Sequence, residues 1–438
     1  MHFGVISPPV PGHIHPFGSL GRELSARGHR VTFFHVPDLE SRVLAEGLNF
    51  VPIGADSHPP GSLSASLARL GQLDGLAALR FTIGEVCKAT GMMLRDGLPV
   101  IADHQVDALL VDQTEAAGAT IAERLGIPFI TVCNALALNR EAGVPPPFTA
   151  WGPNQGVFAR IRNRFGYAMS NRALDSIRKS VAGYRSQWNL AAYDDPEASF
   201  SSLAQISQQV SAFDFPRRQL PQCFHYVGPL RVPSPRQSSF PWEKLDGRPL
   251  VYASLGTLQN GKERIFRSFA EACVTLPVQL VIAHGGGLDE RAAASFPGAP
   301  VFVNYAPQLE VLSRARLTLT HAGLNTVLDS LSCGVPMVAV PITYEQPAIA
   351  CRIAWSGAGR VIRLSQLSVP RLKNAIEDVL ANPAYTERAR VVQRSIRESG
   401  GAKRAADLIE QLLVKEVSPP VPVPAQCVPA ETDSCTRP

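Results

Sequence analysis

Several patterns that mark common classes of protein are missing from this chain of 438 residues. No uninterrupted run of about 18 apolar residues occurs, so no segment is predicted to span a membrane. The eight cysteines form no Cys-x-x-Cys pair and sit mostly in apolar segments, which predicts reduced thiols. The opening residues MHFGVISPPV lack the basic and long apolar regions of a signal peptide, so we expect a cytoplasmic protein. Lysine and arginine are scattered and the net charge is only +5, which argues against a nucleic-acid partner.

The chain does contain a regular alternation of short, β-branched apolar runs with longer helical patterns. Continuous apolar strands separated by helices are typical of buried parallel sheets with right-handed crossovers. We therefore predict an α/β protein with two doubly wound, Rossmann-like domains that face each other across a cleft. The expected strands are residues 2–7, 30–36, 108–112, 128–134, 249–256, 279–285, 301–306, 317–323 and 336–342.

Composition divides the chain near its midpoint. Residues 230–248 are rich in proline, serine and charge and have no periodicity, which predicts a linker. It separates an N-terminal domain, residues 1–229, from a C-terminal domain, residues 249–415. Residues 416–438 are proline-rich and are expected to form an extended or disordered tail. Ligands bind at the carboxyl ends of strands in open parallel sheets, so residues just after the strands are the candidates for a site.

The strand at residues 317–320 is followed by the sequence HAGLNT. Gly323 permits a sharp turn, and Asn325 or Thr326 can cap or open the next helix. The first N–H groups of that helix suit a phosphate, and His321 can add a donor. On this motif alone, a capped turn without a ligand is an equal alternative. Neighbouring strand ends favour a nucleotide-sugar site because they carry further small or polar residues, namely Ser254, Gly256, Thr257, Tyr305, Ala306, Gln308, Glu345 and Gln346.

The ordered series Tyr-Ala-Pro-Gln, His-Ala-Gly-Leu-Asn-Thr-x-x-Asp, Gly-Val-Pro and Glu-Gln resembles the signature of the UDP-dependent family 1 glycosyltransferases, which have the two-domain GT-B fold. The resemblance implies that the N-terminal domain, 1–229, binds the acceptor and that the C-terminal domain, 249–415, binds the UDP-sugar. It further implies that Tyr305 stacks on uracil; a core or rim aromatic is the alternative for this residue. It also implies that the Ala306 backbone binds the base and that Gln308 faces the ribose.

The same resemblance assigns the rest of the donor site. His321 and the helix start, Gly323, Leu324, Asn325 and Thr326, are expected to contact the diphosphate. Asp329 stands where the family usually has a glutamate that binds the ribose hydroxyls. Glu345 stands where an aspartate is usual, and with Gln346 it is expected to hold the glucose hydroxyls.

A catalytic pair is predicted in the first half of the chain. The first strand ends in SPPVPGHIHP, which is not the Gly-x-Gly-x-x-Gly of a dinucleotide site. It reads as a loop that presents His13 and His15 to the cleft. Transfer to a hydroxyl needs a general base with a near-neutral pKa, which suits histidine, and a carboxylate to orient it. Asp112, at the end of its strand, lies at the right edge of the sheet.

The resemblance favours His13 as the base and Asp112 as its partner, and leaves His15 to packing or to contact with the acceptor. A histidine with no proton role and a helix-capping aspartate are the alternatives. The chain has no Asp-x-Asp motif, which agrees with a metal-independent mechanism. We expect no cofactor beyond the donor substrate, UDP-glucose.

Segments spread over residues 1–415 resemble bacterial zeaxanthin glucosyltransferases, among them DSHPPG at 56–61 and LNRE at 138–141. The resemblance implies inverting transfer of glucose to the 3- and 3'-hydroxyls of zeaxanthin, which gives the mono- and diglucoside. An apolar groove lined by residues 63–79, Phe81, Leu136 and Phe148 is expected, with His58 and Glu141 as acceptor contacts. A lipophilic acceptor and the small positive charge suggest peripheral contact with the inner face of the cytoplasmic membrane.

Three other functions are compatible with the sequence. A UDP-glycosyltransferase for a soluble acceptor, such as a flavonoid or a macrolide, would keep every donor residue. A GT-B-like nucleotide-sugar epimerase would need no acceptor groove. A catalytically silent UDP-sugar binder would be favoured by loss of His13 or Asp112, and both are present.

Overall fold

The computed structural model describes residues 1–71, 73, 75–232, 239–289 and 295–417. All but the first two residues of the predicted tail, 416–438, lie outside this range. The described parts of the predicted linker contain one short 3-10 turn, Trp242–Lys244.

The N-terminal half is built on a sheet of seven parallel strands in the order β3-β2-β1-β4-β5-β6-β7. The four strands predicted in this half are confirmed. Three more were missed because β6 and β7 have three residues each and β3 is short and partly exposed, so no apolar period is visible. The strands are β1 (His2–Ile6), β2 (Arg30–His35), β3 (Asn49–Pro52), β4 (Ala108–Asp112), β5 (Phe129–Cys133), β6 (Gln205–Ser207) and β7 (Phe224–Tyr226).

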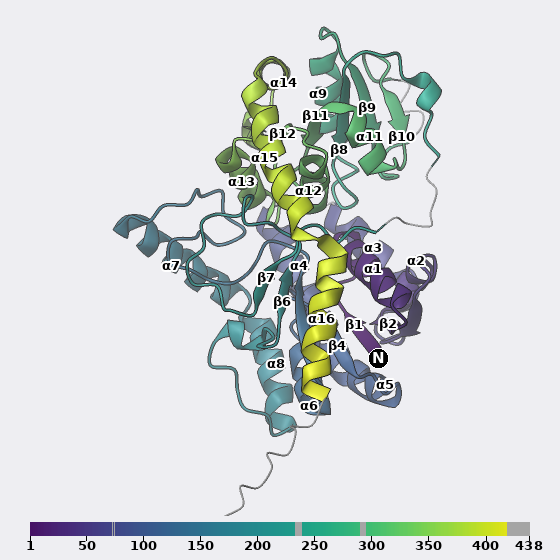
Figure 1. The fold of residues 1–438 in the computed structure, drawn as a ribbon, viewed down its shortest axis with the longest axis vertical. Coiled ribbons are helices and arrows are strands. Elements are labelled where there is room, and N and C mark those ends of the chain that lie inside the picture. Colours follow the sequence, from purple (N-terminus) through teal and green to yellow (C-terminus); the bar gives the residue numbers. More distant parts are fainter. Residues whose placement is uncertain (72, 74, 233–238, 290–294, 418–438) are drawn as a thin grey trace, which may run out of the picture.

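Helices cover both faces of this sheet, and Phe3, Phe17 and Phe33 lie at the centre of its core. Beyond β5 a long excursion carries two further helices to one side of the molecule (Figure 1). The helices of this half are α1 (Pro11–Ala26), α2 (Glu40–Leu44), α3 (Ser62–Gly71), α4 (Gly75–Met92), α5 (Leu98–Asp103), α6 (Gly118–Leu125), α7 (Val157–Ala173) and α8 (Asp175–Gln187). Short turns are Pro37–Leu39, the π-helical Met93–Gly97 and Pro196–Ser199.

The C-terminal half is built on six parallel strands in the order β10-β9-β8-β11-β12-β13. All five strands predicted here are confirmed, and the α/β class with two parallel sheets is correct. The elements are β8 (Leu250–Ser254), α9 (Glu263–Cys273), β9 (Gln279–Ala283), β10 (Val301–Val303), α11 (Gln308–Arg314), β11 (Ala315–Thr320), α12 (Leu324–Ser332), β12 (Met337–Ala339), α13 (Gln346–Ser356), β13 (Gly359–Val361), the 3-10 turn Leu364–Gln366, α14 (Val369–Ala381), α15 (Pro383–Ser399) and α16 (Gly401–Val417).

The two halves share a hydrophobic core and a buried ion pair. Leu136 and Phe213 of the first half pack with Leu324 and other residues of α12 and α13. Beside them, the Arg352 guanidinium donates to one oxygen of the Asp214 carboxylate at 2.8 Å, and both side chains are almost completely buried. Burial would raise the pKa of Asp214, but the charges of Arg352 and its neighbours hold it at about 2. This aspartate therefore stays ionised at neutral pH.

Helix α16 returns from the C-terminal half to the N-terminal sheet. It lies against α1, and Ala402, Ala405 and Ile409 join the core around β1 (Figure 1). Arg27, the residue that follows α1, fixes it with ion pairs to Asp407 at 2.7 Å and to a neighbouring glutamate. The predicted C-terminal domain, 249–415, included this segment, whereas its buried side chains belong to the other core.

The buried ion pair gives a stability prediction. Asp214→Asn removes the charge that faces Arg352 and leaves a buried guanidinium without a counter-ion. We expect the free energy of unfolding to fall by about 3 kcal/mol, with a matching drop in melting temperature. The exposed pair between Arg360 and Asp378 provides the control, because Asp378→Asn should cost less than about 1 kcal/mol. Equal melting temperatures for the two variants would contradict the role given to Asp214.

Candidate active site

His13 and Asp112 meet at the carboxyl edge of the N-terminal sheet. His13 Nδ1 lies 2.8 Å from Asp112 Oδ2, and the Asp112 side chain is fully buried while that of His13 is 17% exposed. They come together because β1 and β4 are parallel neighbours, which places the segments that follow them side by side. The prediction of a loop around His13 is wrong. Helix α1 already begins at Pro11, because proline suits the first position of a helix. His13 therefore stands in the first helical turn.

The Asp112 carboxylate is held by more than the histidine. Its Oδ1 accepts from the Thr114 backbone at 2.9 Å and from the Thr114 hydroxyl at 2.6 Å, while Asn134 Nδ2 donates to Oδ2 at 2.9 Å. Asp112 does not cap a helix, because α6 begins only at Gly118. Sequence reasoning missed Thr114 and Asn134, although an aspartate two residues before a threonine at a strand end is a recognisable turn signal.

The protonation of the pair follows from its surroundings. Burial disfavours the His13 cation, but the charge and hydrogen bond of Asp112, with the charge of Glu345, raise the pKa of His13 above 6.5. Burial acts on Asp112 in the opposite sense, yet His13 and Thr114 keep its pKa below the usual 3.8. Since Nδ1 is engaged by the carboxylate, Nε2 is the nitrogen left to exchange a proton.

A second carboxyl group, partly buried, lies next to this pair. Glu115 accepts from the Ala117 backbone at 3.2 Å, and burial, reinforced by the charge of Asp112, raises its pKa to about 7. Nothing in the sequence pattern singled it out.

Asn325 connects the two halves at the start of helix α12. Its Nδ2 donates to the Gly12 carbonyl at 2.8 Å, and its Oδ1 accepts from Gln208 and from Arg231, both at 3.1 Å. Neither Asn325 nor Thr326 caps the helix, because Gly323 holds the cap position without a side-chain bond. The polar side chain instead reaches across to the turn that carries His13.

The His321 ring is packed between two glycines. A Cβ atom on Gly256 would lie 2.9 Å from the ring, and one on Gly323 only 2.6 Å, so both positions need glycine. Gly256 also has φ of +67°, which other residues rarely adopt. Burial lowers the pKa of His321 to about 4, against a weaker opposing effect of the Ser254 backbone. His321 is therefore neutral at physiological pH, unlike a cationic phosphate ligand.

Asp329 lies one turn beyond Asn325 on the same face of α12. Its Oδ1 accepts from Arg231 Nε at 2.9 Å, and its Oδ2 accepts from Gln308 Nε2 at 2.6 Å. The Gln308 amide is oriented in turn by the Tyr252 hydroxyl at 3.1 Å. Sequence reasoning placed Asp329 and Gln308 near one another but missed Arg231, since a basic residue in a linker carries no positional signal.

The remaining donor candidates differ in their surroundings. Gln346 Oε1 accepts from the backbones of Ile342 and Thr343, both at 2.9 Å, and closes the loop after β12. Glu345 reaches the N-terminal half, where it accepts from the Leu136 backbone at 3.0 Å. Burial raises the pKa of Glu345, against opposing effects of that N–H and of His13.

The candidates nearest the expected base site are more open. Tyr305 is 59% exposed, so it is a rim residue and not part of the core. Ala306 is partly buried beside it, Thr257 is exposed, and Ser254 accepts from the Gly256 backbone.

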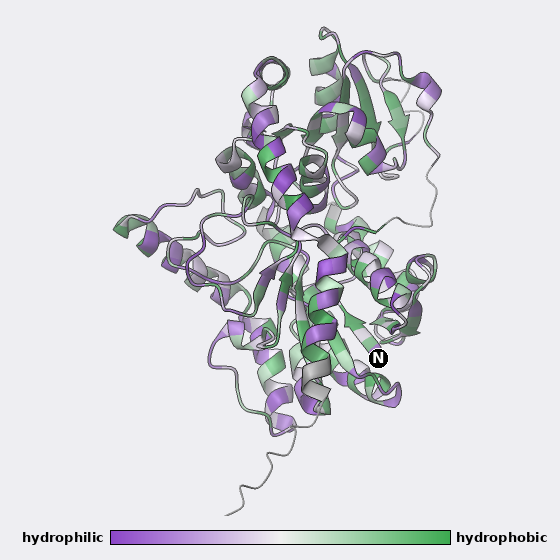
Figure 2. Ribbon diagram, in the orientation of Figure 1, coloured by the Kyte–Doolittle hydropathy of each residue, from purple (hydrophilic) through white to green (hydrophobic). Residues whose placement is uncertain are grey.

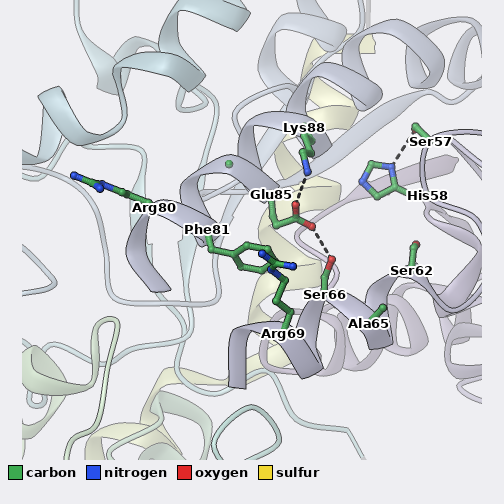
Figure 3. A pocket seen from close by; sticks show the side chains of 11 residues that line it. Ser57, His58, Ser62, Ala65, Ser66, Arg69, Arg80, Phe81, Glu85 and Lys88 are labelled. Carbon is green, nitrogen blue, oxygen red and sulfur yellow. Dashed lines mark hydrogen bonds and ion pairs between the residues drawn. The ribbon is translucent and has the colours of Figure 1, made fainter. Parts of the chain in front are cut away.

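The acceptor candidates are not brought together. His15 is exposed on α1. His58 lines a cavity of about 600 Å³ between α3 and α4, shared with Phe81 (Figure 3). Glu141 lines a different cavity of about 600 Å³, next to α7. Leu136 was predicted to line the acceptor groove. This prediction is wrong, because the side chain is fully buried in the core between the halves.

The described residues contain neither a metal-binding cluster nor a membrane-spanning helix. No group of three or more His, Cys, Asp or Glu side chains in this part of the chain could hold a metal ion. Within the same ranges, no helix has the length and the apolar character needed to cross a membrane.

Comparisons with known proteins identify the family. Residues 81–397 match the family described as UDP-glucoronosyl and UDP-glucosyl transferase, and residues 11–134 match the glycosyltransferase family 28 N-terminal domain. A zeaxanthin glucosyltransferase of Pantoea ananas is 37% identical, covering 94% of this chain and 96% of that protein. A zeaxanthin glucosyltransferase of Pseudescherichia vulneris is 35% identical, covering 94% of this chain and 98% of that protein.

Solved structures give the fold. A glycosyltransferase of kitacinnamycin superposes with a TM-score of 0.76 at 24% identity, covering 94% of this chain and 99% of that one. The calicheamicin glycosyltransferase CalG4 superposes with a TM-score of 0.73 at 24% identity, covering 95% of this chain and 99% of that one. The fold is thus GT-B.

The surroundings of His13 predict a titration. The pKa of His13, followed by NMR of the imidazole, should lie above 6.5 in the unmodified protein. Asp112→Asn removes the main raising influence and leaves burial, so the pKa should fall below 6.5. His321, neutral across pH 5.5–8.5 because its pKa is about 4, serves as the unchanging reference in the same spectra. An unaltered His13 titration in the variant would show that the carboxylate does not control this histidine.

Proposed function

The chain belongs to the UDP-glucoronosyl and UDP-glucosyl transferase family, and from this premise we propose that it transfers glucose from UDP-glucose to the 3- and 3'-hydroxyls of zeaxanthin. It is a glycosyltransferase of GT-B fold that uses a UDP-sugar donor. The observation that carries the finer proposal is the similarity, over nearly the whole chain, to two zeaxanthin glucosyltransferases at 37% and 35% identity. Because the similarity includes the N-terminal half, it extends beyond the donor site.

In the proposed mechanism, His13 removes the proton of the acceptor hydroxyl. The hydroxyl oxygen attacks the anomeric carbon from the face opposite UDP, the bond to the diphosphate breaks, and the configuration is inverted. Asp112, fixed by Thr114 and Asn134, stabilises the imidazolium that forms and keeps Nε2 directed to the substrate. An α-linked donor gives a β-glucoside.

We assign the departing diphosphate to the N-terminus of α12, where Gly323 gives no side-chain cap and the first backbone N–H groups of a helix suit an anion. A neutral His321 adds one hydrogen bond from a buried position. These groups supply the charge stabilisation that we propose in place of a metal ion. The proposed diphosphate site also includes the loop at the end of β8, with Ser254, Gly256 and Thr257. Tyr305 is proposed to stack on the base.

The Asp329 carboxylate is proposed to bind the ribose hydroxyls although two groups already hold it. A carboxylate offers about four acceptor positions, and Arg231 and Gln308 use one on each oxygen. The remaining positions can accept two ribose hydroxyls. Arg231 and Gln308 thus orient the shorter side chain, and Glu345 with Gln346 is assigned to the glucose hydroxyls.

The acceptor is proposed to enter beside α3 and α4. The cavity of Figure 3 lies near the carboxyl end of the N-terminal sheet, because Asp38, just after β2, accepts from the backbones of Gly61 and Leu63 at the start of α3. Its lining combines Phe81 with charged residues such as Arg69 and Lys88. Such a lining suits the hydroxylated ring of zeaxanthin. The same polarity also favours a second candidate, transfer to a soluble acceptor such as a flavonoid or a macrolide.

The proposed acceptor is tested by incubating the purified protein with UDP-glucose and zeaxanthin in detergent or liposomes. Chromatography should show the monoglucoside first and then the diglucoside, and His13→Ala should lower the rate at least about a hundredfold without loss of UDP binding. Flavonoid and macrolide acceptors run in parallel. UDP-glucose hydrolysis alone, or transfer only to a soluble acceptor, would refute the zeaxanthin proposal. Full activity of His13→Ala would refute the base assignment.

The ribose assignment is tested on the donor side. Asp329→Ala should raise the KM for UDP-glucose roughly ten- to a hundredfold with a smaller effect on kcat, because it removes charge-assisted bonds to substrate hydroxyls. Asp329→Glu is the matched control and should keep the KM close to that of the unmodified enzyme. If the alanine variant had an unchanged KM, Asp329 would not be a ribose ligand.

A further inference from the structure

Helix α7 presents an apolar stripe to solvent. Phe158 is 90% exposed and Phe165 is 65% exposed, and Val157, Ile161 and Met169 are exposed with them. These residues recur every three or four positions, so they share one face of the helix. The opposite face carries Ala159 and Asn163, which are buried. Large side chains on a helix normally face the core, and here they face away from it.

Contacts on the inner face hold α7 in this orientation. Asn163 Nδ2 donates to the Ala142 carbonyl at 3.0 Å, and the Tyr167 hydroxyl donates to the Val144 carbonyl at 3.0 Å. Arg140 donates to Asn171 at 2.7 Å and lies over the Tyr167 ring. The stripe is therefore displayed by a fixed helix.

Cationic side chains border the stripe. The helix contains four arginines and no acidic residue between Val157 and Ala173. Arg160, Arg164 and Arg172 are exposed, and within the described part of the chain none of them forms an ion pair or a hydrogen bond. Arg162 lies over the Trp151 ring at 4.5 Å. An apolar stripe with basic flanks and no acidic residue is typical of a helix that lies in a membrane interface.

The helix is also placed where a flat surface can reach it. Figure 1 shows α7 at the left edge of the molecule, projecting from the N-terminal half, and its outer end is hydrophobic in Figure 2. No other segment of the described chain covers that end in this view.

We propose that α7 is a docking surface for a lipid bilayer with anionic headgroups. Phe158, Ile161 and Phe165 would enter the boundary between headgroups and acyl chains, while the arginines contact lipid phosphates. A second copy of the chain fits less well, because two such helices would bring unpaired arginines of the same sign together. The proposal concerns the surface of the N-terminal half and stands whichever acceptor the enzyme uses.

The test is sedimentation of the full chain with vesicles, without donor or acceptor. The protein should bind vesicles of phosphatidylcholine and phosphatidylglycerol, and bind phosphatidylcholine alone much more weakly. Phe158→Ser with Phe165→Ser should weaken binding at least about tenfold. Both residues are exposed, so the fold should be unaffected. Leu44→Ser with Leu364→Ser, two exposed leucines on other elements, is the matched control and should bind normally.

A second set of variants tests the electrostatic contribution of the arginines to vesicle binding. Arg160→Glu with Arg164→Glu should abolish the preference for anionic vesicles. Arg390→Glu with Arg394→Glu makes the same change at the same spacing on the exposed side of α15 and should leave binding intact. UDP-glucose hydrolysis in the absence of vesicles should be equal in all variants, which shows that the donor site is folded.

Three outcomes would overturn the proposal. The unmodified protein could fail to bind anionic vesicles, or the serine variant could bind them as well as the control. A concentration-dependent dimer that the serine variant loses, without vesicle binding, would assign the stripe to a second copy. Absence of zeaxanthin glucoside in the separate acceptor assay bears on the enzyme's substrate and leaves this result untouched.

Discussion

The placement of the whole site depends on the contact between the starts of helices α1 and α12. The Asn325 amide, at the first turn of one helix, binds the Gly12 carbonyl at the first turn of the other. His13 is the next residue along the chain, so the proposed base and the helix end that we assign to the donor diphosphate are fixed to each other directly. The shared core and the Arg352–Asp214 pair behind this contact keep the two sheets from sliding apart.

Two histidines at this junction, His13 and the more deeply buried His321, have opposite protonation behaviour. A buried carboxylate raises the pKa of His13, whereas His321 has no such neighbour and burial lowers its pKa to about 4. One ring can therefore take up a proton during a reaction while the other stays a neutral hydrogen-bonding group. The difference arises from the position of one charge, Asp112, rather than from the chemistry of the side chains.

The sequence was informative where a residue sits directly after a strong strand. Asp112, His321 and the helix start after β11 could be placed because parallel strands bring their carboxyl ends to one edge. It was less informative about the groups that hold these residues, such as Thr114, Asn134 and Arg231. Hydrogen bonds between residues far apart in the chain leave no periodic trace. The three-residue strands were missed for the same reason, because their pairing partners lie far away in the chain. The sequence of α16 shows an apolar face but does not indicate which of the two sheets that face covers.

Helix α16 also affects the order in which the protein can be completed during synthesis. The core around β1 needs Ala402, Ala405 and Ile409, yet the strands of that sheet end at Tyr226. A nascent chain that has released its first half from the ribosome thus exposes an unfilled apolar groove beside α1 until nearly the whole chain has followed. The N-terminal core is complete only once α16 has been added, so this helix couples the completion of the first half to the synthesis of the second.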